Sequence, residues 1–353
     1  MNVTDFLNAN AYPGAGQNAR CKYLNKGSTV TLAALTTEYN FFTAPLANPF
    51  TSNFVIPFSG DNVFFLKKLA IFCDISDATI LGTVFGNLMQ SFLEIWVNDR
   101  QQYKISLIKL LNFGWQNIDT AVAGEVSVSN FEEREKVFVN PIIINSTANI
   151  RFRLHMNAAA VAALVGANLM LVMTGFQFDK LKQFEFDDMQ ANQFQRLDFD
   201  MYDIQLAVAT ANNYQLFANP NRSEELFSKV LPLAESETFQ VESIQVIFSD
   251  HAAVAPNHNL WFPSRQKRLS VYLNDVSFWD SYISKALSYY GDYLVAAVNN
   301  RLSVWRRELL ETPILIPAKS NNSVVLQQPA STTPVATQPF LVSFEGEITR
   351  RVA

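Results

Sequence analysis

Apolar and polar positions alternate along most of the chain, and this alternation predicts strands. Leu69, Ile71 and Cys73, for example, are spaced by two residues, so their side chains share one face of a strand. The alternating segments are short and separated by turn residues, which is typical of an all-β sandwich. In the first half of the chain the predicted strands span residues 29–36, 53–58, 64–75, 92–97, 136–144, 150–156 and 169–178.

The strand pattern occurs twice, about 175 residues apart. Residues 93–99 (Leu-Glu-Ile-Trp-Val-Asn-Asp) match residues 269–275 (Leu-Ser-Val-Tyr-Leu-Asn-Asp). Further matches keep the same order along the chain: Tyr39 with Tyr214, Phe64 with Phe239, residues 140–144 with 312–316, and Gly175 with Gly346. An ordered series at a nearly constant offset favours an internal duplication. Two unrelated sandwiches that share strand patterning are the alternative.

Directly after the repeated Asn-Asp pair, the spacing of apolar residues changes to that of a helix. Asp99 is a suitable N-cap, Leu107 and Leu111 lie on one apolar stripe, and Gly114 is a suitable C-cap glycine. The second copy repeats the switch and ends at Gly291. The sequence therefore predicts a helix after a central strand in each half.

These patterns together predict an all-β fold of two tandem eight-stranded jelly-roll barrels, each with a helix after a central strand. The expected organisation is an N-terminal arm (1–27), a first jelly roll (28–178), a connector (179–200) and a second jelly roll (201–353). A chain of 353 residues has the length of two domains, and each half is long enough to bury its own core.

The composition adds an expectation about partners. Hydrophobic residues make up 49% of the chain, 29 residues are Phe, and charged residues make up only 17%. This is more apolar surface than two cores require, which suggests large contacts with copies of the same chain. The net charge of -5 argues against a protein that wraps nucleic acid. Basic clusters at 265–268, 306–307 and 350–351 are interpreted as solvated faces or as salt-bridging residues at a subunit contact.

The cysteines and the start of the sequence bear on location. Cys21 and Cys73 are far apart and are predicted to be thiols, which favours a reducing compartment. The first residues lack the charged and apolar regions of a signal peptide, and no apolar run is long enough to span a bilayer. We therefore expect a soluble protein made in a cytoplasm.

One predicted loop is unusually apolar. Residues 158–167 are almost all Ala, Val and Leu, and such a loop on the surface needs something to cover it. We hypothesise that Ala160, Val161, Leu164 and Val165 belong to a loop at a subunit interface.

Motifs for chemistry are missing from the sequence. His155, His251 and His258 have no partner at a metal-ligand spacing, and no nucleophile elbow, phosphate-binding loop or dinucleotide fingerprint occurs. Adjacent carboxylates such as those at 132–133 are most simply solvated charges, although a glycosidase needs only two carboxylates at a suitable distance. We expect no catalytic, cofactor-binding or metal-binding residue, no cofactor, and no enzymatic activity.

The layout resembles that of the double jelly-roll major capsid proteins of tailless icosahedral viruses with an internal membrane. Within that family the chain resembles a bacteriophage-like member. The resemblance covers residues 28–351. It depends on matched segments of the two halves: 96–99 with 272–275, 141–144 with 313–316, and 169–178 with 340–349.

The resemblance implies a structural protein of the virion capsid, synthesised in the host cytoplasm. Three copies would form a pseudo-hexameric capsomer, and capsomers would tile an icosahedral shell over an internal lipid membrane. Implied partners are neighbouring capsomers, penton proteins, and minor capsid or membrane proteins. By the same resemblance, the arm with Val3, Phe6 and Leu7 would lie near the membrane.

Two other classes remain open from the residues alone. A glycan-acting enzyme on a double β-sandwich would need convergent carboxylates at a cleft. A carbohydrate-binding or spike protein would usually have a more polar exterior.

Overall fold

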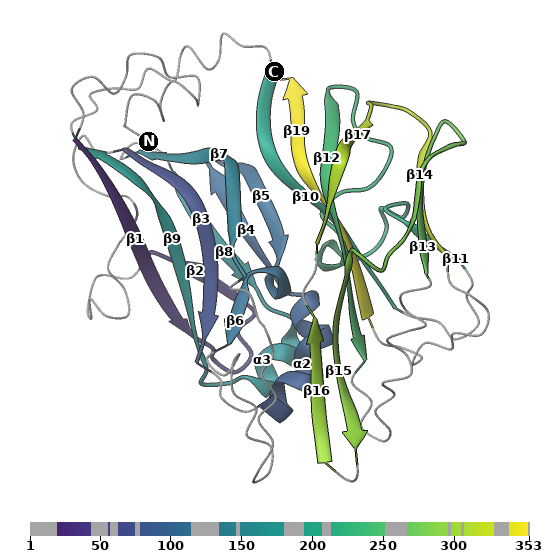
Figure 1. Ribbon diagram of the computed structural model, residues 1–353. Coiled ribbons are helices and arrows are strands. Elements are labelled where there is room, and N and C mark those ends of the chain that lie inside the picture. The colour runs from purple at the N-terminus through teal and green to yellow at the C-terminus, as the bar shows by residue number, and fades with distance from the viewer. Residues whose placement is uncertain are drawn as a thin grey trace.

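The computed structural model describes residues 20–43, 56, 63–74, 78–113, 134–145, 149–179, 194–206, 213–250, 267–295, 298–304, 307–327 and 339–351. These residues form four sheets, two in each half of the chain (Figure 1).

The first half packs two sheets around one hydrophobic core. One sheet runs β1 (Arg20–Thr31), β9 (Asn168–Asp179) and β3 (Val63–Cys73), with β7 (Lys136–Asn145) and β6 (Leu111–Phe113) both paired to β3. The other sheet runs β2 (Glu38–Phe41), β8 (Ile150–His155), β4 (Phe92–Val97) and β5 (Arg100–Ser106).

The second half repeats this arrangement. One sheet runs β10 (Phe194–Leu206), β19 (Pro339–Arg351) and β12 (Glu237–Asp250), with β17 (Glu308–Ile316), and with β15 (Leu287–Val295) followed by β16 (Val298–Val304). The other sheet runs β11 (Asn213–Leu216), β18 (Asn322–Gln327), β13 (Arg268–Leu273) and β14 (Val276–Tyr282).

These strand orders are those of a jelly roll. When the main strands of the first half are counted along the chain without the short β6, one sheet contains the first, eighth, third and sixth strands. The other contains the second, seventh, fourth and fifth. The second half gives the same two orders when β15 and β16 are left out. The predicted fold class, two tandem jelly rolls, is therefore confirmed.

The duplication extends to irregularities of the backbone. The pairing of β3 shifts register within residues 66–68, opposite Gly175, and that of β12 shifts within residues 241–243, opposite Gly346. A Cβ atom on either glycine would collide with a backbone carbonyl oxygen of the bulged strand. Both bulges therefore require glycine at the same place in the roll.

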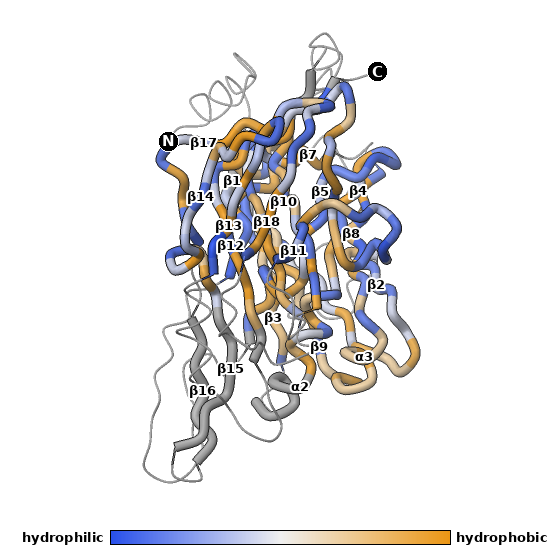
Figure 2. The backbone as a smooth tube through the Cα atoms, turned by 90° about the vertical axis from the view of Figure 1, so that its right-hand side faces the viewer, coloured by the Kyte–Doolittle hydropathy of each residue, from blue (hydrophilic) through white to orange (hydrophobic). Residues whose placement is uncertain are grey.

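Each roll buries alternate residues of its strands. Hydrophobic and hydrophilic residues succeed one another along the strands in Figure 2. The first core contains, among others, Leu69, Ile71, Leu93, Ile95 and Phe152. The second contains, among others, Phe239, Ile244, Val271, Leu326 and Phe344. Both cores draw side chains from both sheets of their roll, as a sandwich requires.

The predicted helix after β4 is wrong. Asn98 and Asp99 have positive φ angles of 48° and 60°, and the chain returns as β5, which pairs antiparallel with β4. Asn274 and Asp275, with φ of 49° and 64°, make the same turn between β13 and β14. Two consecutive residues of positive φ match the twist of a tight hairpin. Asp99 is therefore a turn residue, and only a 3-10 turn, η1 (Leu107–Lys109), follows β5.

The helices lie elsewhere. The described α-helices are α2 (Ala78–Met89), before β4, and α3 (Ala158–Ala163), within the apolar segment that we expected to be a loop. A second 3-10 turn, η2 (Glu224–Leu226), follows β11. In α3 the side chain of Asn157 accepts a hydrogen bond from the N–H of Ala159, which caps the helix start.

The strands also extend past the expected domain boundaries. β1 begins at Arg20 and pairs with β9 along its whole length, so residues 20–27 belong to the first roll instead of the arm. β10 begins at Phe194, so residues 194–200 belong to the second roll instead of the connector. The predicted strand at 53–58 lies almost wholly outside the described residues.

Candidate functional site

Part of the apolar segment is covered by its own chain. Ala160, Val161 and Leu164 are buried within the first core, and α3 contacts α2. A second subunit is therefore not needed to cover these three side chains, which removes the reason for placing them at a subunit interface. Val165 is 52% exposed, and its contact with a second subunit stays a prediction.

Several predicted site residues lie outside the described part of the chain. These are Val3, Phe6 and Leu7 of the arm; His251 and His258, for which no metal site was predicted, also lie outside it.

The contact between the two rolls is the most extensively built polar site in the described structure. β10 of the second roll lies between the rolls, against β5 and β7 of the first (Figure 1). Tyr202, Ile204, Ile247 and Leu341 of the second roll are buried within the hydrophobic cluster of the first roll. The two rolls therefore share a continuous apolar contact.

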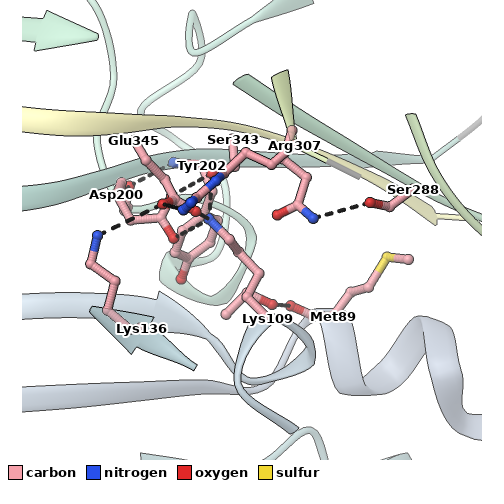
Figure 3. A network of polar contacts seen from close by, with 12 residues as sticks. Met89, Lys109, Lys136, Asp200, Tyr202, Ser288, Arg307, Ser343 and Glu345 are labelled. Carbon is pink, nitrogen blue, oxygen red and sulfur yellow. Dashed lines mark hydrogen bonds and ion pairs between the residues drawn. The ribbon is translucent and has the colours of Figure 1, made fainter. Parts of the chain in front are cut away.

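A set of polar and charged side chains, all buried except Arg307, crosses this contact, and we call it the inter-roll network: Lys109, Lys136, Asp200, Arg307, Ser343 and Glu345. Lys109 extends from the first roll, and its Nζ donates to Asp200 Oδ2 at 2.8 Å, to Ser343 Oγ at 2.7 Å and to Glu345 Oε1 (Figure 3). The hydroxyl of Ser343 donates in turn to Asp200 Oδ1 at 2.5 Å.

Glu345 is the centre of the network. Besides Lys109, its carboxylate faces Arg307 Nη1 at 3.1 Å and Lys136 Nζ at 3.7 Å. The side chains of Lys109 and Asp200 are 3% and 0% exposed. Charges removed from water at this depth are tolerated only when each has an opposite charge and hydrogen bonds, and here they have both.

The protonation preferences follow from this geometry. Burial alone would raise the pKa of Glu345, but Lys109, Lys136 and Arg307 outweigh it and hold that pKa well below its usual range. Burial alone would lower the pKa of Lys109, but the carboxylates of Asp200 and Glu345 raise it above the ordinary value. Burial, helped by the neighbouring Glu345 carboxylate, raises the pKa of Asp200. The centre of the network is therefore a charged lysine held by two acidic groups.

Further polar contacts flank the network. The carboxylate of Asp198 accepts hydrogen bonds from the backbone N–H groups of Val139 at 2.6 Å and Asn140 at 3.2 Å. On the other side, Lys104 Nζ donates to the backbone carbonyls of Glu224 at 2.7 Å and Phe227 at 3.3 Å. The second roll is thus fixed to the first at three places along the contact.

The residues of this site do not stand out in the sequence. Only Arg307 was singled out, in a basic cluster interpreted as solvated or salt-bridging; it makes an ion pair within the chain, as does Arg268 with Asp280. The duplication held no signal for it either, because Lys109 matches Lys285 in the second copy and only the structure shows that one of the two lysines is buried.

The described residues offer little toward catalysis or metal binding. His155 stacks on Phe92 with ring centroids 4.6 Å apart, and its Nε2 lies 3.3 Å from Glu94 Oε2. Within the described ranges, no three His, Cys, Asp or Glu side chains gather as a metal site would require. The same ranges contain no helix that is long and apolar enough to cross a membrane. The inter-roll network binds its members to one another, so its evident role is to hold the two rolls together.

Of the comparisons with known proteins, that with solved structures found similar proteins. The sequence matches no protein-family model and no curated protein. Among solved structures, the chain is similar to the major capsid protein P2 of bacteriophage PM2, with 7% identity and a TM-score of 0.39, over 95% of this chain and 98% of that one.

Two further solved structures are similar over most of both chains. PBCV-1 VP54, fitted into a reconstruction of the virophage Sputnik, is 9% identical with a TM-score of 0.41, over 96% of each chain. The STIV major capsid protein is 9% identical with a TM-score of 0.38, over 93% of this chain and 96% of that one. The likeness drawn from the sequence was to this class of protein, and the fold itself is established by the strand orders above.

Proposed function

We propose that the chain is a structural capsid subunit. Three copies pack into a pseudo-hexameric capsomer, and capsomers tile an icosahedral shell over an internal lipid membrane. Two of the structural neighbours reported above are major capsid proteins. The support for the proposal comes from the structure and the surface of this chain.

The single observation that carries the proposal is the duplicated jelly roll. Each half has the same two sheet orders, and the two halves are joined by a buried contact with a charged centre. A chain with two similar, firmly joined modules lets three copies present six similar corners. Such a unit can contact six neighbours in a closed lattice with only three chains.

The surface supports assembly as well. Large apolar side chains are exposed on strands of both rolls: Tyr23 on β1, Phe72 on β3, and Val276, Phe278 and Tyr282 on β14. Exposed aromatic residues on this scale favour protein contacts over permanent contact with water.

The remaining partners follow from the proposed role. A capsomer of this kind contacts neighbouring capsomers, penton proteins at the vertices, and minor capsid or membrane proteins. We further propose that the arm with Val3, Phe6 and Leu7 lies toward the internal membrane. Floating of the purified protein with vesicles of phosphatidylcholine and phosphatidylglycerol, compared with a variant lacking residues 1–19, tests this point. Equal floating of both proteins would contradict it.

The mass of the purified protein in solution tests the central proposal. Light scattering should give about 119 kDa, three times the 39.8 kDa of one chain. Negative-stain images of that species should show six-cornered outlines. A protein that stays at 39.8 kDa at high concentration would contradict the proposal and favour a glycan-acting enzyme or a carbohydrate-binding protein. Hydrolysis or binding on a panel of glycans would then separate those two classes.

A further inference from the structure

The contact between the rolls uses one face of each roll, and the repeat gives each of these faces a counterpart. On the second roll the buried face is the outer side of β10, β19 and β12, where Ile247 is 1% exposed and Asp198 is 6% exposed. Their counterparts on the first roll are Phe72 and Tyr23, which are 38% and 56% exposed. The first roll thus leaves uncovered the face that the second roll buries.

The face of the first roll that is buried against the second roll also has an uncovered counterpart, on the second roll. On the first roll Lys109 of η1 is buried against Asp200 and Glu345 of the second roll, and Ser106 of β5 is buried nearby, where its hydroxyl donates to Met89 O of α2. The counterparts of Ser106 and Lys109 on the second roll are Tyr282, which is 57% exposed, and Lys285, which is exposed. Phe278, on the same strand as Tyr282, is also exposed.

We call the two uncovered surfaces the β1 face and the β14 face. The β1 face is the outer side of the first sheet, with Tyr23, Phe72, Met170, Val172 and Phe176. The β14 face consists of Phe278, Asp280, Tyr282, Lys285 and Glu308.

The charged residues of each buried face can be compared with the residues at the counterpart positions of the uncovered face. The four carboxylates of the buried second-roll face, Asp198, Asp200, Glu345 and Glu347, have as counterparts on the β1 face Tyr23, Asn25, Thr174 and Phe176. The three lysines of the buried first-roll face, Lys104, Lys109 and Lys136, have as counterparts on the β14 face Asp280, Lys285 and Glu308. Within the chain, a lysine-rich face therefore meets an acidic face.

The uncovered faces are complementary in a different way. On the β14 face Asp280 pairs with Arg268, and Lys285 and Glu308 carry opposite charges. The β1 face has no charged residue at the counterpart positions and presents Tyr23 packed edge-on against Phe176, with ring centroids 5.2 Å apart. Lys68, opposite Thr174 on the same side of the sheet, is paired with Glu135 at 2.6 Å, so both uncovered faces combine exposed aromatic side chains with paired charges.

We infer that the β1 face of one chain binds the β14 face of a second copy, in the same manner as the two rolls bind within one chain. This interface rests on the proposed function and names the surfaces that build the capsomer. The two faces lie at opposite ends of the molecule, with β10 between them (Figure 1). Contacts of this head-to-tail kind close into a ring when the rotation per step divides a full turn.

Two variants, each altered on one face, test the inference. The first is Tyr23→Glu with Phe72→Glu on the β1 face, and the second is Phe278→Glu with Tyr282→Glu on the β14 face. Leu35→Glu is the matched control, because Leu35 is fully exposed and lies on neither face. Removing buried aromatic anchors in this way should raise the dissociation constant about 30-fold or more. Circular dichroism should show that all three variants keep the wild-type fold.

Mixing the variants distinguishes a head-to-tail contact from other arrangements. Each face variant alone should remain at 39.8 kDa at a concentration where the wild type and the control assemble. Mixed in equal amounts, they should form a dimer of about 80 kDa, twice 39.8 kDa, because each supplies the face that the other lacks. A mixture that stays monomeric, or variants that assemble like the wild type, would overturn the inferred interface and leave the proposed function standing. A wild-type chain that is itself monomeric at concentrations on the order of 100 µM would overturn both.

Discussion

Replacing Lys109 by Met should strongly destabilise the chain. The substitution keeps the length of the side chain but removes the positive charge that Asp200 Oδ2 contacts at 2.8 Å and that Glu345 also contacts. It leaves two carboxylates whose side chains are 0% and 8% exposed facing each other across the gap. Removal of one partner from a buried ion pair typically costs about 3–5 kcal/mol, and Arg307 and Lys136 compensate Glu345 but not Asp200.

The repeat supplies the control. Lys285 occupies the counterpart position in the second roll and is exposed within the chain, so Lys285→Met should change the free energy of unfolding by less than about 0.5 kcal/mol. Unfolding in urea, followed by far-ultraviolet circular dichroism at concentrations that keep both proteins monomeric, gives the comparison. Equal stabilities of the two variants would refute the role assigned to the network.

The pH dependence gives a second check on the same reasoning. The folded pKa of Lys109 is raised, so its contribution is complete below 10.5, the ordinary lysine value, and is lost as pH rises through the folded pKa. The folded pKa of Glu345 is depressed, so its contribution is present above 4.5 and is lost as pH falls through the folded pKa. The stability difference between wild type and Lys109→Met should therefore be largest between these limits. It should shrink in acid, where Asp200 becomes protonated and no longer needs the lysine.

Three further predictions follow from individual positions. Gly175→Ala and Gly346→Ala should each cost about 1–3 kcal/mol in urea unfolding, because the added methyl group collides with backbone at a bulge; a neutral effect at either glycine would contradict the close approach. Tyr103→Phe should leave stability unchanged or raise it by up to about 3 kcal/mol, since the buried hydroxyl has no hydrogen-bond partner among the described residues. Burial also raises the pKa of Tyr103 well above 10.0, so wild type should lose stability as pH rises past 10 and Tyr103→Phe should lose less. Equal losses of stability in the two proteins would contradict this. Leu164→Ser should cost about 2–5 kcal/mol, whereas Val165→Ser should be nearly neutral in the monomer and weaken assembly only if Val165 contacts a second subunit; light scattering and urea unfolding separate the two effects.

The strands were predictable because alternation with period two is a local property of the sequence. Residues 92–97 are β4 as predicted; the predicted strand at 136–144 differs from β7 by one residue at one end, and that at 169–178 differs from β9 by one residue at each end. The duplication then placed the strands in two equivalent rolls. Its matched pairs, such as Gly175 with Gly346, proved equivalent even at the bulges.

The helix after β4 was predicted wrongly because a spacing of three or four apolar residues also arises in a strand followed by a tight turn. Tyr103 and Leu107 are both buried, but one lies on β5 and the other on η1. The repeated Asn-Asp pair was the better signal, since Asn and Asp tolerate the positive φ that a two-residue hairpin turn demands.

The inter-roll network could not be predicted from sequence spacing. Lys109 lies 91 residues from Asp200 and 236 residues from Glu345 along the chain, and nothing local distinguishes it from Lys285. Only the packing of one roll on the other decides which lysine is buried. Packing within the first roll, in contrast, explains the apolar side chains of Ala160 and Val161, which α3 buries in the first core.

A single-particle reconstruction of the purified oligomer tests the account most directly. It should show three chains around a threefold axis, with six jelly rolls in a ring and β1 of each chain beside β14 of the next. A particle with twofold symmetry, or one in which the β1 and β14 faces remain open to solvent, would contradict it.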